Sequence, residues 1–226
     1  VGKIDVVLPR GSAKLINLVV ENAKVPVIQT GAGVCHLYVD ESANLENAAK
    51  IAQNSKMQRP GACNAIETIL VNRKVLKEFL PLLANEFDEK VQIRADKECH
   101  SVLQNAGYKN LKEAVDSDFG FEFLDFIVAV RQVESTEQAI EFINAHNTKH
   151  SECIATNDRN HALMFQQQID AACIYVNAST RFTDGGVFGF GAELGISTQK
   201  LHARGPMGAE ALTTTKFLID GNGQIR

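Results

Sequence analysis

The segment from Leu45 to Val71 shows in one stretch how the chain alternates between helix and strand. It opens with an amphipathic run, Leu45 to Lys56, whose apolar residues recur at helical spacing. The irregular sequence Gln58-Arg59-Pro60-Gly61-Ala62-Cys63-Asn64 follows, and its proline and glycine end the helix. The apolar run Ile69-Leu70-Val71 then predicts a buried strand. The stretch is therefore typical of an α/β fold.

The same alternation continues on both sides of this segment. Apolar runs predict further strands at Ile4–Leu8, Val25–Ile28, His36–Val39, Phe126–Val130, Cys173–Val176 and Lys216–Ile219. Amphipathic patterns predict helices at Ser12–Ala23 and at Val75–Phe87, the second with an interruption at Pro81. Cap residues predict two more: one begins at Ser135, with Gln138 in a capping box, and one runs from an Asn157 cap to about Ile169. The stretch from Ala95 to Phe121 is expected to hold a short helix and a surface loop. This order of elements predicts an α/β fold with a largely parallel sheet.

Composition narrows the classes of function. The 226 residues are 45% hydrophobic, which is enough to build the core of one large domain or two small ones. A net charge of -4 without a basic patch argues against nucleic acid as a partner. No apolar run approaches the roughly 20 residues of a membrane helix, so no membrane association is expected.

The five cysteines point to a reduced, cytoplasmic protein. Their odd number and scattered spacing do not form a disulfide framework. Without a Cys-x-x-Cys pair, and with no metalloprotease spacing among the six histidines, no metal site is expected.

Cys63 is the first candidate for chemistry. A cysteine in a Pro-Gly loop can lie exposed beside backbone N–H groups, which stabilise a thiolate and later an oxyanion. The residues alone leave open the alternative of a small side chain packed under a turn.

Two further stretches carry donors at the ends of predicted strands. Asn177 to Gly186 follows the Cys173–Val176 strand, and Arg181 within it can bind a carboxylate or phosphate, or form a structural ion pair. Arg10-Gly11-Ser12 joins a predicted strand to a helix, where free N–H groups can face an anion, although Ser12 is also a common N-cap. The glycine-rich runs Phe188–Gly191 and His202–Gly208 match no nucleotide-binding motif and are expected to form tight turns.

Several of these stretches together resemble one enzyme family. The run from Gln58 to Val71 resembles the active-site segment of the gamma-glutamyl phosphate reductases, also called glutamate-5-semialdehyde dehydrogenases, in the aldehyde dehydrogenase superfamily. Val133–Ile154, Asn177–Gly186 and Gly191 through Gly208 resemble other segments of the same family. The resemblance covers nearly the whole chain.

The resemblance implies how the chain is organised. It implies an aldehyde dehydrogenase-like catalytic domain with a largely parallel sheet, plus a remnant of a dinucleotide-binding domain. Residues 1–30 are similar to the C-terminal part of the dinucleotide-binding domain, 31–205 to the catalytic domain, and 206–226 to a return segment and oligomerisation strand. Because the family's chain is about twice this long, we expect the C-terminal half of the enzyme, inactive when alone.

The resemblance also implies roles for individual residues. It makes Cys63 the catalytic nucleophile, and it places Gly11, Ser12 and Glu122 at the cofactor NADPH. A solvated loop carboxylate is the alternative for Glu122. For the substrate, we expect binding by Asn64, Ser179, Thr180 and Arg181.

One departure from the wider superfamily agrees with this reading. Hydrolytic aldehyde dehydrogenases carry a water-activating glutamate just after the strand that is predicted to end near Gln29. This chain instead reads Gln29-Thr30-Gly31. An enzyme that carries its substrate as a reducible thioester has no use for a base that hydrolyses it.

The reaction that the resemblance implies is the reduction of L-glutamyl 5-phosphate to L-glutamate 5-semialdehyde in proline biosynthesis. It implies a homo-oligomer and an association with glutamate 5-kinase. Two alternatives stay open: another CoA- or phosphate-type aldehyde dehydrogenase, or, for the chain alone, a non-catalytic oligomerisation domain.

Overall fold

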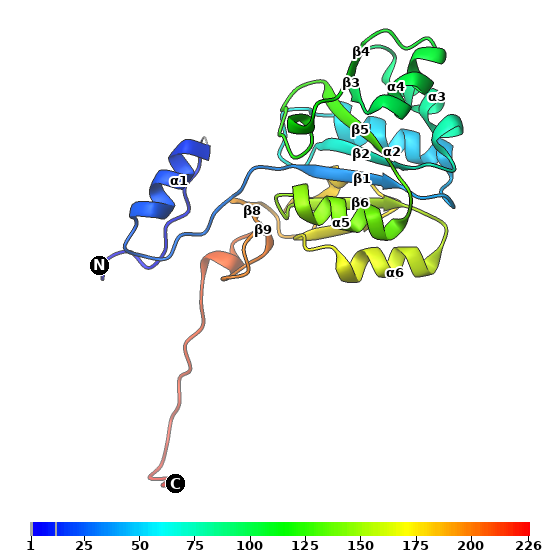
Figure 1. Cartoon of the computed structure of the whole chain (residues 1–226). Coiled ribbons are helices and arrows are strands. Elements are labelled where there is room, and N and C mark those ends of the chain that lie inside the picture. The colour runs from blue at the N-terminus through cyan, green and yellow to red at the C-terminus, as the bar shows by residue number, and fades with distance from the viewer. Residues whose placement is uncertain (1, 12) are drawn as a thin grey trace.

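A seven-stranded parallel sheet forms the centre of the computed structural model, which describes residues 2–11 and 13–226 (Figure 1). The strands lie in the order β4-β3-β5-β2-β1-β6-β7, and every neighbouring pair is parallel. Their bounds are β1 Cys35–Val39, β2 Ile66–Asn72, β3 Gln92–Ala95, β4 Leu111–Glu113, β5 Ile127–Val133, β6 Ser151–Ala155 and β7 Cys173–Val176. The predicted fold class, an α/β fold with a largely parallel sheet, is confirmed.

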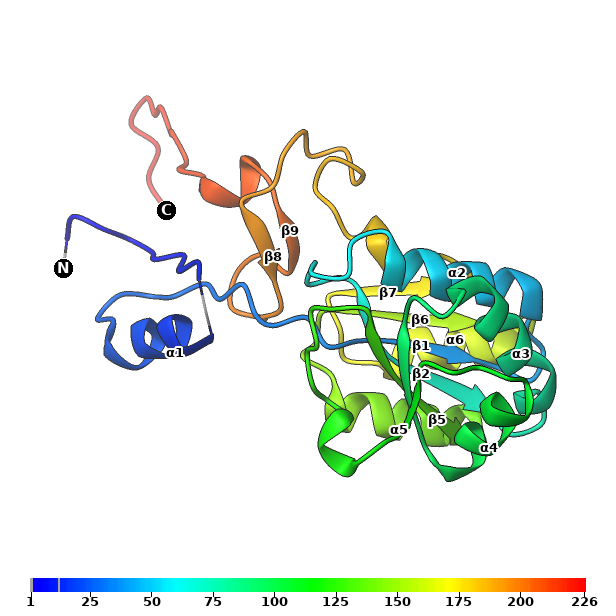
Figure 2. The same cartoon turned by 90° about the horizontal axis from the view of Figure 1, so that it is seen from above.

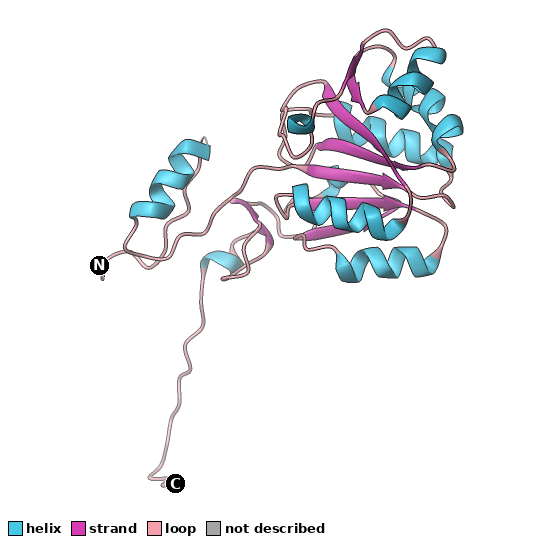
Figure 3. Cartoon of the chain, in the orientation of Figure 1, coloured by secondary structure: helices cyan, strands magenta, loops and turns pink. Residues whose placement is uncertain are grey.

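Helices cover both faces of this sheet (Figure 3). One face carries α2 (Leu45–Met57), α3 (Leu76–Phe87) and α4 (Lys97–Asn105), and the other carries α5 (Thr136–His146) and α6 (Arg159–Gln168). Successive strand residues serve opposite faces. Leu37 and Val39 of β1 pack with α2 and α3, whereas Tyr38 packs with α5 and α6. The central strands are buried on both sides, as parallel sheets require.

The two ends of the chain lie outside this core. Residues 2–11 and α1 (Ala13–Asn22) stand apart from the sheet in both Figure 1 and Figure 2, and the last residues extend away from it. Between them and the sheet lies a short antiparallel pair, β8 (Gly195–Ser197) and β9 (Gly205–Met207). A bridge from Thr30 to Ser197 joins this pair to the chain entering β1.

Three predicted strands are wrong. Ile4–Leu8 and Val25–Ile28 meet only in a single parallel bridge between Val7 and Val27, which is too little pairing to form a ladder. Lys216–Ile219 forms no strand, and Phe217, Leu218 and Ile219 are each at least 80% exposed. The physical reason is the same in each case, because an apolar run becomes a strand only beside a second strand that takes its hydrogen bonds.

Other expectations needed smaller corrections. Pro81 does not interrupt α3, whose Phe79, Leu80 and Leu83 are completely buried, because burial offsets the hydrogen bond that proline removes. Asp158, rather than Asn157, caps α6 and accepts from the Asn160 and His161 backbone N–H groups.

The capping box and the region after Ala95 differ in detail as well. Ser135 does cap α5, but the Gln138 side chain accepts from the Glu134 N–H instead of the N–H of Ser135. The short helix expected after Ala95 is α4. Sequence analysis missed β3, β4 and β6, since runs of three to five residues that include polar side chains show no clear apolar pattern.

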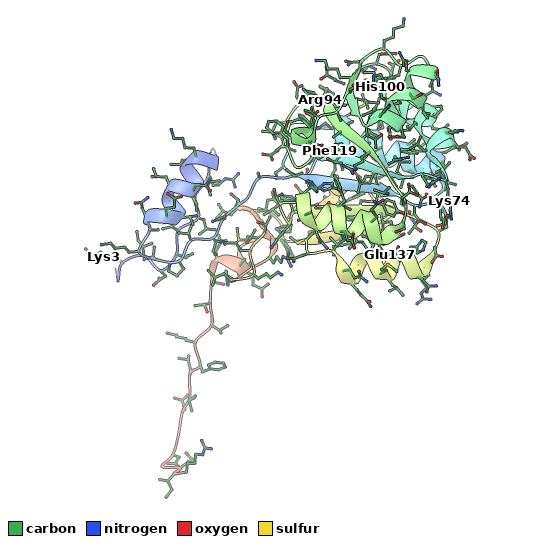
Figure 4. The ribbon with its side chains drawn as sticks, in the orientation of Figure 1. Lys3, Lys74, Arg94, His100, Phe119 and Glu137 are labelled. Atoms are coloured by element: carbon green, nitrogen blue, oxygen red, sulfur yellow. The ribbon has the colours of Figure 1, made fainter. Side chains whose placement is uncertain are left out.

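The direction of the strands gives the sheet two distinct edges. The amino ends of the strands face the segment carrying α1 and the β8–β9 pair, and the carboxyl ends face away from it (Figure 3). Lys74, which follows β2, marks the carboxyl edge in Figure 4. In the described residues, no helix combines the length and apolar character that a bilayer crossing demands.

Candidate active site

Cys63 lies in the loop between α2 and β2, at the amino edge of the sheet. Backbone bonds from Ala62 N to Arg59 O and from Ala65 N to Ala62 O fold the loop into tight turns on either side of it. The Cys63 side chain is partly exposed, whereas Cys35, Cys99, Cys153 and Cys173 are buried. Cys63 is therefore the cysteine of this chain best placed to meet a reagent in solution.

Gly33 and Cys35 both contact the backbone carbonyl of Cys63. A Cβ atom on Gly33 would lie 1.5 Å from the Cys63 carbonyl oxygen, so only glycine fits at this point of contact. The Cys35 thiol donates to the same carbonyl oxygen at 3.3 Å. These contacts hold the Cys63 peptide against the segment that leads into β1.

A cleft of about 470 Å³ opens in front of Cys63. Three of the residues that sequence analysis expected at the site, Gly11, Cys63 and Glu122, line it together, although they are far apart in the chain. Ser12 lies outside the described residues. The remaining lining comes from the chain before α1, the segment entering β1 and the residues around β8, namely Arg10, Ile16, Thr30, Gly31, Ala32, Leu124, Glu193, Gly195 and Ile196. The cleft thus lies between the sheet and the outlying N-terminal segment.

The electrostatics of the cleft favour a protonated thiol at Cys63. Burial raises the pKa of Cys63, and the carboxylates of Glu122 and Glu193 add to this effect. The backbone N–H of Cys63 and the charge of Arg181 act in the opposite direction.

Glu122 is anchored by a short hydrogen bond. Its Oε1 atom accepts from the Gly33 N–H at 2.6 Å, while the side chain stays partly exposed toward the cleft. A carboxylate can accept on both oxygens, so this bond leaves room for a second partner. The alternative of a freely solvated loop carboxylate does not describe this arrangement.

Asn64 and Thr180 tie the segment after β7 to the Cys63 loop. Asn64 Nδ2 donates to the Thr183 carbonyl at 2.9 Å, and its Oδ1 accepts from Arg181 Nη1. Thr180 Oγ1 donates to the Asn64 carbonyl at 2.6 Å. Both side chains are buried, so in this structure they hold the loop rather than face the cleft.

Ser179 and Arg181 differ in what they face. Ser179 is bonded to Ser55 Oγ at 2.9 Å and borders a separate polar cavity beside α2, not the Cys63 cleft. Arg181 is partly exposed, donates through Nε to Gln58 Oε1 at 2.7 Å, and is in no ion pair with any described residue. Of the four expected substrate-binding residues, Arg181 is therefore the one with a charge available to a ligand.

Sequence analysis missed the structural role of Gly33 and the position of Glu193. The run Gly31-Ala32-Gly33 directly before a strand was the available signal for a close backbone approach. Glu193 lies just after the glycine-rich run Phe188–Gly191, outside the residues proposed for the site. It accepts from the Gly185 N–H at 2.8 Å and also borders the cleft.

Comparisons with known proteins agree with this fold. Residues 126–217 match the family model described as the aldehyde dehydrogenase family. A propionaldehyde dehydrogenase from Clostridium phytofermentans superposes with a TM-score of 0.70 at 18% identity, over 94% of this chain and 56% of that one, which shows the shared fold. These matches show that the chain has the aldehyde dehydrogenase fold and is similar to members of that family.

The chain is also similar to gamma-glutamyl phosphate reductases. It is 54% identical over 224 residues to that of Ligilactobacillus salivarius and 56% identical over 224 residues to that of Halothermothrix orenii. Both matches cover 99% of this chain, and they cover 53% and 52% of the two relatives. The Thermotoga maritima enzyme superposes with a TM-score of 0.93 at 47% identity, over 99% of this chain and 53% of that one. The chain spans about half the length of these relatives.

Proposed function

We propose that this chain supplies the catalytic half of an enzyme that reduces L-glutamyl 5-phosphate to L-glutamate 5-semialdehyde in proline biosynthesis. The observation that carries the proposal is the accessible Cys63 in a cleft shared with Gly11 and Glu122. The sequence identity of 54% and 56% to two gamma-glutamyl phosphate reductases supports the choice of substrate.

Cys63 performs the bond-making step. Its thiolate attacks the acyl carbon of the substrate, the bond to the phosphate oxygen breaks, and phosphate leaves. Backbone N–H groups beside Cys63 hold the oxyanion that forms during this attack. After reduction, the hemithioacetal on Cys63 releases the aldehyde and returns the sulfur to its starting state.

NADPH is the cofactor that we propose, and it supplies the hydride when bound. The residues of the cleft fit such a group. Gly11 adopts a φ of 147° just before α1, so a backbone without a side chain faces the space at the start of a ten-residue helix. Glu122 keeps one carboxylate oxygen available for ribose hydroxyls. We propose Gly11, Ser12 and Glu122 as cofactor-binding residues on this basis.

Arg181 is the proposed ligand for an anionic end of the substrate. Its bonds to Gln58 and Asn64 aim a pre-oriented guanidinium at the region of the Cys63 loop. We propose that Asn64 and Thr180 assist by holding this loop, and that Ser179 contributes from the neighbouring cavity.

The wider organisation of the enzyme is also proposed. We assign residues 1–30 to the C-terminal part of a dinucleotide-binding domain and 31–205 to the catalytic domain. We assign residues 206–226 to a return segment and an oligomerisation strand, which would form as a strand only beside a partner chain. The exposed apolar residues Phe217, Leu218 and Ile219 favour a homo-oligomer in which they are covered. Association with glutamate 5-kinase, a cytoplasmic location, and inactivity of the 226 residues when alone complete the proposal.

Acylation of Cys63 tests the central step directly on this chain. Incubation with an acyl phosphate is expected to add one acyl group, located on Cys63 by peptide mass spectrometry and released by hydroxylamine. The buried cysteines are expected to stay unmodified. Absence of acylation on a folded chain, or labelling spread over all five cysteines, would contradict the nucleophile assignment and favour a non-catalytic oligomerisation domain.

Substrate choice is tested in a full-length enzyme that contains these residues. Oxidation of glutamate 5-semialdehyde with NADP is expected to depend on added phosphate, which takes the acyl group from Cys63. Dependence on coenzyme A instead would identify a CoA-type aldehyde dehydrogenase.

A further inference from the structure

A buried ion pair joins the two ends of the Cys63 loop. Lys56, in the last turn of α2, contacts Glu67, the second residue of β2, with 2.6 Å between Nζ and Oε2. Both side chains are completely buried. Buried charge pairs of this kind seldom add much stability over apolar residues of the same size, so their presence calls for another explanation.

The second oxygen of Glu67 reaches across to the far wall of the cleft. Glu67 Oε1 accepts from the Leu124 backbone N–H at 3.2 Å. Leu124 has a φ of 55°, a left-handed conformation that costs energy for a residue with a side chain. The hydrogen bond from its N–H to Glu67 helps to hold Leu124 in that conformation.

The segment held in this way carries Glu122. Leu124 and Glu122 both line the cleft, and Glu122 accepts from Gly33, which packs on the Cys63 carbonyl. In Figure 2 the loop before β2 and the segment before β5 lie at the same end of the sheet. A continuous set of contacts therefore runs from Lys56 through Glu67 and Leu124 to the residues around Cys63.

The charges around the pair agree with a role at the site. Burial raises the pKa of Glu67 to about 7, with Lys56 opposing this and Glu122 adding to it. Burial also lowers the pKa of Lys56, against the effects of Glu67, Cys35 and Asp125.

We propose that Lys56 and Glu67 are positioning residues, which hold the 122–124 segment over the Cys63 loop so that the Glu122 carboxylate suppresses the Cys63 thiolate until ligands bind. The inference rests on the proposed role of Cys63 as the reactive thiol. It concerns the reactivity of that thiol and is independent of which acyl phosphate is the substrate.

Two double variants separate the hydrogen bond from the charge. Lys56→Met/Glu67→Gln removes the ion pair but keeps an oxygen that can accept from Leu124 N–H. Lys56→Met/Glu67→Met removes both the ion pair and the acceptor, with side chains of similar volume. Arg73→Met/Glu134→Gln removes an exposed ion pair beyond the carboxyl ends of β2 and β5 and serves as the control.

The readout is the rate of Cys63 alkylation by iodoacetamide, measured from pH 6 to 10 on the 226-residue chain and located by mass spectrometry. The Met/Met variant is expected to react about tenfold faster at neutral pH, the change in thiolate fraction for one pKa unit. The Met/Gln variant and the control are expected to match the unmodified chain. In a Glu122→Gln background the difference between the two double variants is expected to disappear.

Equal alkylation rates and pH profiles in the two folded double variants would overturn the proposal. If the Met/Met variant does not fold, amide hydrogen exchange on the unmodified chain decides instead. Protection of the Leu124 N–H supports the proposal, and exchange at the rate of a free amide overturns it. Cys63 acylation by an acyl phosphate is a separate measurement, so failure of the proposed function and failure of this inference are distinguishable.

Discussion

The two edges of the parallel sheet use their polar residues in opposite ways. At the carboxyl edge, Asp40 follows β1 and accepts from the Ser42 and Thr156 hydroxyls at 2.6 and 2.8 Å. Tyr38 and His161 also donate to it, so the polar groups of this edge satisfy one another. At the amino edge, Cys63 and Glu122 instead border an open cleft.

The proposed Cys63 site does not lie where the general rule for open α/β sheets would place it. In open α/β sheets, ligands gather beyond the carboxyl ends of the strands, and Asn177 to Gly186 was singled out partly on that ground. The segment does begin at the carboxyl end of β7, but it returns along α2 until Arg181 reaches Gln58 and Asn64 at the other edge. The polar groups of the carboxyl edge thus bond to one another, whereas the amino edge keeps the open cleft in which we propose the chemistry.

The largest expected effect comes from removing the nucleophile at the amino edge. In a full-length enzyme, Cys63→Ser is expected to lower turnover by a factor on the order of 10⁴ or more, because the other four cysteines of this chain are buried. Thermal unfolding is expected to be unchanged, since the side chain is partly exposed. Cys173→Ser, a buried cysteine outside the cleft, is the control, and normal turnover by Cys63→Ser would show that the nucleophile lies elsewhere.

Removing the acceptor at the carboxyl edge is expected to act on stability instead. Asp40→Ala leaves the buried Tyr38 and Thr156 hydroxyls without this acceptor, so the free energy of unfolding should fall by about 3–5 kcal/mol. Urea unfolding of the 226-residue chain measures this loss, with the exposed Asp220→Ala as control. Cys63 alkylation in the folded fraction should not change. A large change in that rate would mean that the two edges are coupled.

Gly33 tests how closely the amino edge is packed. Gly33→Ala places a methyl group against the Cys63 carbonyl, and we expect a loss of about 3 kcal/mol together with altered alkylation of Cys63. Gly61→Ala in the same loop is the matched control, because its Cβ would meet only ordinary contact at 3.6 Å. Equal stability of the two variants would disprove the close contact.

A substitution at Arg181 tests whether the Asn177–Gly186 segment binds the substrate. Arg181→Lys keeps the charge but loses the planar fork, so we expect the Michaelis constant of the full-length enzyme to rise roughly 10- to 100-fold. Arg59→Lys, an exposed arginine of the Cys63 loop, is the control. Unchanged kinetics in Arg181→Lys would mark its bonds to Gln58 and Asn64 as purely structural.

The smallest effect is the acid sensitivity of the carboxyl edge. Burial alone would raise the pKa of Asp40, but hydrogen bonds from Ser42, Thr156 and His161 outweigh it and lower the pKa to about 2. The unfolded chain binds this proton near pH 4, so the contribution of Asp40 is complete above that pH and is lost as the pH falls from about 4 to about 2. We expect about 2 kcal/mol from this group.

Urea unfolding at a series of pH values checks this expectation. The stability of the unmodified chain should decline between pH 4 and 2, and Asp40→Asn should lack that part of the decline. The same pH profile in both proteins would show that Asp40 is not the group responsible.

The accuracy of the sequence-based predictions follows from how local each feature is. Helices α2, α5 and α6 were predicted within a few residues because apolar spacing and N-caps are local signals. The Lys216–Ile219 strand was wrong because a strand depends on a neighbour that the local sequence does not describe. Cys63 was singled out because its Pro-Gly loop is a local signal, and its role stays a prediction. Gly33 was missed because its contact partner, Cys63, lies 30 positions away in the chain.

The amino-acid sequence by itself determined the alternation of helices and strands, the exposed turn that carries Cys63 and the resemblance to one reductase family. Only the tertiary structure decided that Gly11, Cys63 and Glu122 share one cleft, that Arg181 returns to the amino edge and that Glu67 spans from Lys56 to Leu124. The physical reason is that periodicity and caps act between near neighbours in the chain, while a cleft is built from packing contacts between segments that are distant in it.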